Sequence, residues 1–156
     1  MESSCEILLT LWPPVESVWQ EIEKEVSKEF EILKADTYSF QKDSGHWINF
    51  IVELYRLCYE PSDHCRHPDI KKMVQKAEYM GQYSKNIRLL KIKIEDPKFH
   101  QIKNGNPYGL NEVKNIKNFI REKCPQIPRF SVIHSFDTPA RNEEVISLFK
   151  THCEES

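Results

Sequence analysis

The spacing of apolar residues changes several times along the chain, and each change predicts a different element. Residues 6–12 form a short apolar run that two prolines end, which is typical of a buried strand. Over residues 15–30 the apolar side chains recur every three or four positions, the spacing of an amphipathic helix. Residues 88–95 alternate apolar and polar side chains, which predicts a strand with one buried face.

The other segments continue this alternation of strands and helices. Strand composition returns at residues 30–40 and 129–134, and helical spacing at residues 47–58, 69–80, 111–121 and 139–152. This order of elements is typical of split β-α-β units. We therefore expect one α+β domain over residues 1–156, with a ferredoxin-like, four-stranded, mainly antiparallel sheet and helices packed on one face. Leu90, Ile92 and Ile94 should point to the helices, and the other side of that strand to solvent.

Composition narrows the class of protein. Of the 156 residues 39% are hydrophobic and 29% charged, and the formal net charge is −2. These values suit a globular fold and disfavour a general nucleic-acid coat, although a local basic patch is compatible with them. No apolar run reaches the roughly 18 residues of a membrane helix, and residues 1–10 lack the basic start of a secretory signal. Five scattered cysteines suit reduced thiols, so we expect a cytoplasmic protein without membrane contact.

The first candidate for chemistry is His134, at the end of the last predicted strand. The predicted strand is apolar and ends at His134, where the chain turns toward a helix. The His134 side chain would therefore face a cleft. A neutral histidine there could act as a nucleophile or general base, and Asp137 could orient the ring or fix the turn. The alternative is that His134 only ends the strand and hydrogen-bonds to the backbone.

The segment Val-Ile-His-Ser-Phe-Asp over residues 132–137 resembles the Val-Ile-His-Gly-Ser-Asp segment of nucleoside diphosphate kinases. In that family the histidine receives the γ-phosphate of a nucleotide and passes it to an acceptor nucleotide. Arg121 precedes His134 by thirteen residues, the interval of a phosphate-binding arginine in the family, and Asn106-Pro107 is similar to its Thr-Asn-Pro segment. In the order of its elements, most of the chain resembles the family. The similarity of sequence motifs is limited to about thirty residues.

Four positions depart from the family pattern. Trp12 stands where the family has a phosphate-binding lysine, and Ser131 where it has an asparagine. Ser135 replaces the glycine after the histidine, and Val145 the glutamate that supports its ring. The segment before Arg121, irregular in the family, has helical spacing here. These departures are compatible with a relative that has another substrate, or with one that kept the fold and lost the chemistry.

A second candidate is the polar loop over residues 98–109, which combines cationic side chains with two glycines. Lys98, His100, Lys103 and Asn106 could bind phosphate oxygens there, and the glycines would let the backbone approach a ligand. The following helix adds further positive charge from Lys114, Lys117 and Arg121. The alternative is a solvated loop beside a charged helix face. The cysteines and histidines of residues 58–67 lack standard zinc spacing, so we predict no metal bound by the protein.

Three functions follow from these observations. The first is a nucleotide-dependent phosphotransferase with His134 as phosphate carrier, Arg121 and Lys103 holding phosphates, Asp137 shaping the site, and Mg²⁺ accompanying the nucleotide. The second is a non-catalytic module that binds a nucleotide or RNA at the same sheet edge. The third is a protein-interaction domain. Transfer of phosphate between nucleosides would separate the first function from the other two, and nucleotide binding without turnover would select the second. A homo-oligomer is left open.

Overall fold

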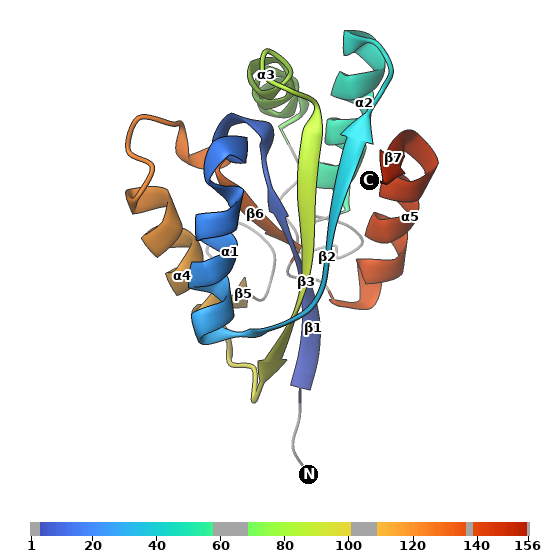
Figure 1. Cartoon of the computed structure of the whole chain (residues 1–156). Helices are drawn as coiled ribbons and strands as arrows, with labels where there is room; N and C mark the ends of the chain where they lie inside the picture. Colours follow the sequence, from blue (N-terminus) through green and yellow to red (C-terminus); the bar gives the residue numbers. More distant parts are fainter. Residues whose placement is uncertain (1–3, 58–68, 101–108, 137–138, 156) are drawn as a thin grey trace.

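A five-stranded antiparallel sheet is the centre of the fold. The computed structural model describes residues 4–57, 69–100, 109–136 and 139–155. The strands lie in the order β6-β1-β3-β2-β7, and every neighbouring pair is antiparallel (Figure 1). Their bounds are β1 Ser4–Leu11, β2 Glu31–Phe40, β3 Asn86–Glu95, β6 Ile133–Phe136 and β7 Cys153–Glu155. A short hairpin of β4 (Phe99–His100) and β5 (Gly109–Leu110) lies apart from this sheet.

Helices connect the strands, and side chains fix where several of them begin. The α-helices are α1 Trp19–Glu29, α2 Ser44–Arg56, α3 Ile70–Met80, α4 Asn111–Glu122 and α5 Asn142–His152, and the 3-10 helices are η1 Pro13–Val18, η2 Arg129–Ser131 and η3 Pro139–Arg141. Asp43 and Asp69 cap α2 and α3, because each carboxylate accepts a hydrogen bond from a backbone N–H of the first turn.

Within the described ranges no helix is long and apolar enough to cross a membrane.

Both faces of the sheet are covered, at least in part, by helices. On one face α1 and α4 pack their apolar stripes on Leu9, Leu90 and Ile92. On the other face α2, α3 and α5 pack on Leu8 and Leu89 (Figure 1). Alternation along a strand sends neighbouring side chains to opposite faces, so each central strand contributes to two cores.

The expected α+β sheet with packed helices is confirmed, with three corrections. The sheet has five strands rather than four, because the chain after α5 pairs with β2 as β7. Helices cover both faces rather than one. The last of the four predicted strands is residues 133–136 rather than 129–134, because residues 129–131 form a 3-10 turn and pairing with β1 starts at Ile133.

The half-buried character of β3 is confirmed for its second half only. Leu90, Ile92 and Ile94 are buried under α1 and α4, and Lys91 and Lys93 between them are partly exposed. The first half of the strand differs, because Ile87 and Leu89 are buried in the core under α2 and α3. One side of β3 is therefore open to solvent only in its second half, at Lys91 and Lys93.

Candidate functional site

His134 lies on β6, the strand at one edge of the sheet. Its backbone is paired with Thr10 of β1, and its side chain points to the face covered by α2 and α3. Three aromatic rings surround the imidazole there. The ring centroids of Tyr55, Phe136 and Trp12 are 4.9, 5.0 and 6.3 Å from that of His134. The residue is only partly exposed to water.

Two cations approach the same strand from α4, on the other face of the sheet. Lys117 and Arg121 are four residues apart, so their side chains project from the same face of α4. The Lys117 ammonium donates a hydrogen bond to Ser135 Oγ at 2.8 Å, and Arg121 Nη2 donates to the backbone oxygen of Ile133 at 2.8 Å. These contacts place one positive charge beside each neighbour of His134 on β6.

A third cation comes from α3. The Lys76 Nζ lies 5.2 Å from the ring centroid of Tyr55 and 5.7 Å from that of Phe130, within the range of cation–π contacts. Tyr55 in turn contacts the His134 ring. Lys76, Tyr55 and His134 therefore form one continuous group on the α2–α3 face.

The charges around His134 determine its protonation state. Burial, followed by Lys117, Arg121 and Lys76, lowers the pKa of the His134 imidazole well below its usual value, so the ring is neutral at physiological pH. Burial likewise lowers the pKa of Lys76 and of Arg121. No carboxylate in the described part of the chain forms an ion pair with Lys76 or Arg121. The site thus combines a neutral imidazole with two cations, Lys76 and Arg121, that no described carboxylate pairs with, which suits an anionic ligand.

Several buried polar atoms at this place lack a hydrogen-bond partner. Thr10 Oγ1, Trp12 Nε1 and Arg121 Nε are buried and make no hydrogen bond among the residues that the structure describes. Buried polar groups normally have partners, because an unpaired one costs about 1–3 kcal/mol. Each of these atoms therefore requires a partner outside the described protein atoms, such as a water molecule or a ligand.

Of the predicted site residues, the structure brings together His134 and Arg121. Lys98 is exposed, and its backbone oxygen meets the N–H of Asn111 at the start of α4, about 15 Å along the helix from Arg121. His100 lies in β4, and its side chain is outside the described part of the structure. Lys103, Asn106 and Asp137 lie outside the described residues, as do residues 58–67. Their roles stay predictions.

Sequence reasoning did not assign Lys76 to this site, and it placed Lys117 only in a broad positive region. Lys117 could have been found from its spacing of four residues to Arg121 on a predicted helix. Lys76 carries no comparable sign, because it lies 58 residues before His134 among other lysines of α3. Its place follows only from the packing of α3 beside Tyr55.

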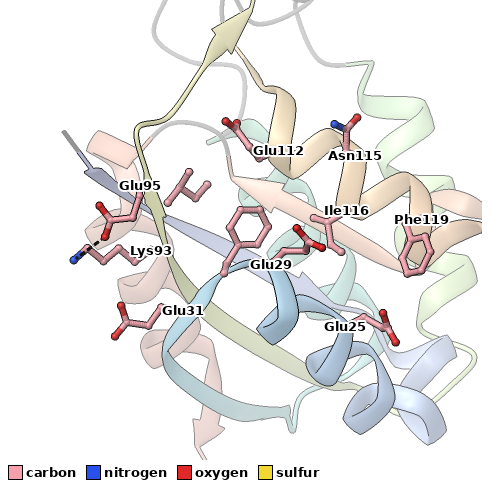
Figure 2. A pocket seen from close by; sticks show the side chains of 11 residues that line it. Glu25, Glu29, Glu31, Lys93, Glu95, Glu112, Asn115, Ile116 and Phe119 are labelled. Carbon is pink, nitrogen blue, oxygen red and sulfur yellow. Dashed lines mark ion pairs between the residues drawn. The ribbon is translucent and has the colours of Figure 1, made fainter. Parts of the chain in front are cut away.

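A separate hollow of about 560 Å³ opens between α1, α4 and the ends of β2 and β3 (Figure 2). Phe30 and Ile116 are among its apolar lining residues, and one lysine of the lining, Lys93, pairs with Glu95 at 3.2 Å. Carboxylates surround it: Glu25, Glu29, Glu31, Glu95 and Glu112 (Figure 2). This excess of negative charge opposes a phosphate ligand. The hollow is negatively charged, whereas the surroundings of His134 are positively charged, and the two lie on opposite faces of the sheet.

Comparisons with known proteins support the fold. No family model matches the chain, and no curated protein matches it. Among solved structures it is similar to the nucleoside diphosphate kinase of Aquifex aeolicus, with a TM-score of 0.53 and 12% sequence identity, over 94% of this chain and 94% of that chain. At this identity the similarity concerns the arrangement of the elements, not the residues of a site.

Proposed function

We propose that this chain binds a phosphate-bearing ligand, a nucleotide, at His134 and transfers its terminal phosphoryl group through that histidine. The observation that carries the proposal is a neutral imidazole with cations from two helices around it and no described carboxylate paired to Lys76 or Arg121. Phosphoryl transfer depends chiefly on positioning and charge neutralisation, which this arrangement supplies. The fold shared with a nucleoside diphosphate kinase supports the same proposal.

The chemistry needs a histidine nitrogen with a free electron pair. The lowered pKa of His134 leaves one ring nitrogen unprotonated. In the proposed step that nitrogen bonds to the terminal phosphorus, the bond from phosphorus to the bridging oxygen breaks, and the nucleoside diphosphate leaves with the electron pair. A second nucleotide oxygen then takes the phosphoryl group and restores the neutral histidine. Arg121 and Lys117 would offset the charge that develops on the phosphate oxygens.

Mg²⁺ enters this proposal only with the ligand. In the described residues no group of three histidine, cysteine or carboxylate side chains could hold a metal ion, and the side chains at His134 are cationic or aromatic. They do not fit an ion bound by the protein. Mg²⁺ commonly binds through phosphate oxygens with few protein ligands, so no step is assigned to protein-bound metal.

A non-catalytic nucleotide-binding module is the second candidate, and two observations favour it. Trp12 occupies space beside His134, and Val145 is buried in the apolar core and cannot orient the ring. Such a module would use the same cations to bind phosphate but would not form a bond to His134. Covalent labelling separates the two functions.

The test of transfer is incubation with γ-labelled ATP and Mg²⁺. The phosphotransferase predicts protein-bound label that is acid-labile and base-stable, the behaviour of a phosphorylated histidine. His134→Ala should abolish the label and His46→Ala, which changes an exposed histidine, should not. Label that persists in His134→Ala would contradict the assignment of the nucleophile. Binding without label would select the non-catalytic module.

The test of binding uses calorimetry with ATP and the variant Arg121→Ala. Loss of a charge-assisted contact should weaken binding by roughly 1.5–3 kcal/mol. Lys114→Ala is the matched control, because Lys114 is an exposed cation on the same helix. No binding by the natural chain at millimolar nucleotide, or equal binding by natural chain and Arg121→Ala, would refute the phosphate site.

A further inference from the structure

The three cations near His134 differ in the face of the sheet from which they come. Lys117 and Arg121 belong to α4, which packs with α1, and both already hydrogen-bond to groups of β6. The His134 side chain points to the opposite face, where its register partner Thr10 and its ring neighbour Phe136 also lie. Lys76 is the cation that α3 brings to this second face.

The position of Lys76 on α3 follows from the apolar stripe of that helix. Met73 and Met80, three residues before and four after it, are buried in the core under α2. Residues at these spacings share one face of a helix, so the Lys76 side chain projects close to the buried face of α3. It is only partly exposed, whereas Lys71 and Lys72 are exposed.

Aromatic rings hold the Lys76 ammonium beside Tyr55, whose ring contacts that of His134. Its Nζ lies 5.2 Å from the Tyr55 ring and 5.7 Å from the Phe130 ring, and the Tyr55 ring lies 4.9 Å from that of His134. Cation–π contacts fix the position of a charge without neutralising it. Within the described ranges no carboxylate pairs with Lys76. An ammonium that is partly buried, held in place and unneutralised is suited to bind a ligand anion.

No described residue of β1 supplies a cation on this face. Trp12, at the end of that strand, presents an aromatic ring to His134, and Thr10 presents a hydroxyl. A phosphoryl group bound at the imidazole would therefore meet positive charge from α4 and from α3, since cations of both helices act on His134. Among the described residues placed around His134 on this second face, those other than Lys76 are aromatic or uncharged.

We infer that Lys76 of α3 binds the phosphoryl group that is presented to His134, acting as the cation of the α2–α3 face opposite Lys117 and Arg121. This inference rests on the proposed function, since it assigns one more binding residue to the same site. It adds that α3 is part of the site. Lys76 contacts ligand oxygens directly and takes no proton.

The test uses inorganic pyrophosphate as the probe and three variants of the whole chain. Lys76→Met removes the charge and keeps an unbranched apolar stem against Tyr55 and Phe130. Lys76→Arg keeps the charge and can stack on the same rings. Lys71→Met removes an exposed charge from the same helix and is the control. Thermal unfolding of each variant establishes that the fold is kept.

We expect Lys76→Met to weaken pyrophosphate binding by roughly tenfold or more, the size of one charge-assisted contact. Lys76→Arg should remain within about threefold of the natural chain, and Lys71→Met should not change affinity. In labelling experiments with ATP, Lys76→Met should raise the nucleotide concentration at half-maximal rate. A loss of folding would weaken pyrophosphate binding by Lys76→Met and Lys76→Arg alike. A loss in Lys76→Met alone therefore reports on the charge.

The outcomes that overturn this inference differ from those that overturn the proposed function. If the natural chain binds pyrophosphate and Lys76→Met binds it equally well, Lys76 is not a ligand residue and the function stands. Equal losses in Lys76→Met and Lys71→Met would assign the effect to general charge and also overturn the inference. If the natural chain does not bind pyrophosphate, the phosphate site itself is refuted and the inference is refuted with it.

Discussion

At the scale of single residues, His134 depends on neighbours that are distant in the sequence. Tyr55 and Trp12 withdraw it from water, and Lys76, Lys117 and Arg121 oppose its protonation. The same residue at an exposed strand end would titrate near pH 6.5. The environment therefore converts an ordinary histidine into one that stays neutral.

The first residue-scale prediction concerns pH. An unfolded chain takes up a proton at this histidine below about pH 6.5, whereas the folded chain does not until its lower pKa is reached. His134 therefore lowers the free energy of unfolding as pH falls below 6.5, by at most about 1.4 kcal/mol per pH unit. Urea unfolding at pH 7.5 and 5.5 should show a smaller acid loss for His134→Gln than for the natural chain. Identical pH dependence in both chains would contradict the buried neutral state.

The second prediction concerns Thr10, whose hydroxyl is fully buried and makes no hydrogen bond to any described residue. Valine has the same shape and removes the unpaired polar atom, so Thr10→Val should raise the free energy of unfolding by about 1 kcal/mol. Chemical denaturation measures this. A decrease instead would show that the hydroxyl has a partner in the folded protein.

At the scale of elements, α3 and α2 are held together by a close contact. Trp47 Nε1 donates a hydrogen bond to the backbone oxygen of Ala77 at 2.8 Å, so the end of α3 lies close to the indole. Gly81 stands at this crossing, where an added Cβ would lie 3.0 Å from Trp47 Cδ1 and Nε1. The glycine is needed for the close approach and not for a left-handed backbone, since its φ is −70°.

The element-scale prediction compares two glycines. Gly81→Ala should lower the free energy of unfolding by about 1–3 kcal/mol, because the indole is buried and must shift. Gly45→Ala, in the exposed first turn of α2, should be neutral or raise stability by up to about 1 kcal/mol, because alanine favours the helix. Denaturant unfolding of both variants tests the contrast, and equal effects would contradict the contact.

At the scale of the whole molecule, one sheet couples two apolar cores. Leu89 and Leu90 are neighbours in β3, and each is buried in a different core. The contact of Arg88 with Glu23 at 2.6 Å and with Thr37 at 2.8 Å further joins β3 to α1 and β2. Loss of packing on one face should therefore reach the other through the shared strands.

The whole-molecule prediction is one cooperative transition. Leu89→Ala and Ile92→Ala remove buried side chains from opposite faces, and each should cost about 2–5 kcal/mol. Tryptophan fluorescence and far-ultraviolet circular dichroism should give coincident unfolding curves for both variants. Separate transitions for the two probes would show that the cores unfold independently.

Much of the fold follows from local patterns. The alternation of residues 90–94 and the helical stripes of α1, α3 and α4 need only their own segment, because burial selects side chains at the period of the element. β7 could not be predicted in this way. Cys153, Glu154 and Glu155 have no apolar alternation, and they become a strand because α5 delivers them to the free edge of β2.

The sequence by itself determined the order of the elements, His134 as a candidate, and Arg121 on the preceding helix. Those features lie within single segments or at a fixed interval in one motif. Only the tertiary structure decided that helices cover both faces, that His134 points toward α2 and α3, and that Lys76 reaches Tyr55, the ring that contacts His134. The physical reason is that charge, burial and protonation depend on distances in space, and the residues that set them at His134 come from α2, α3, α4, β6 and the turn after β1.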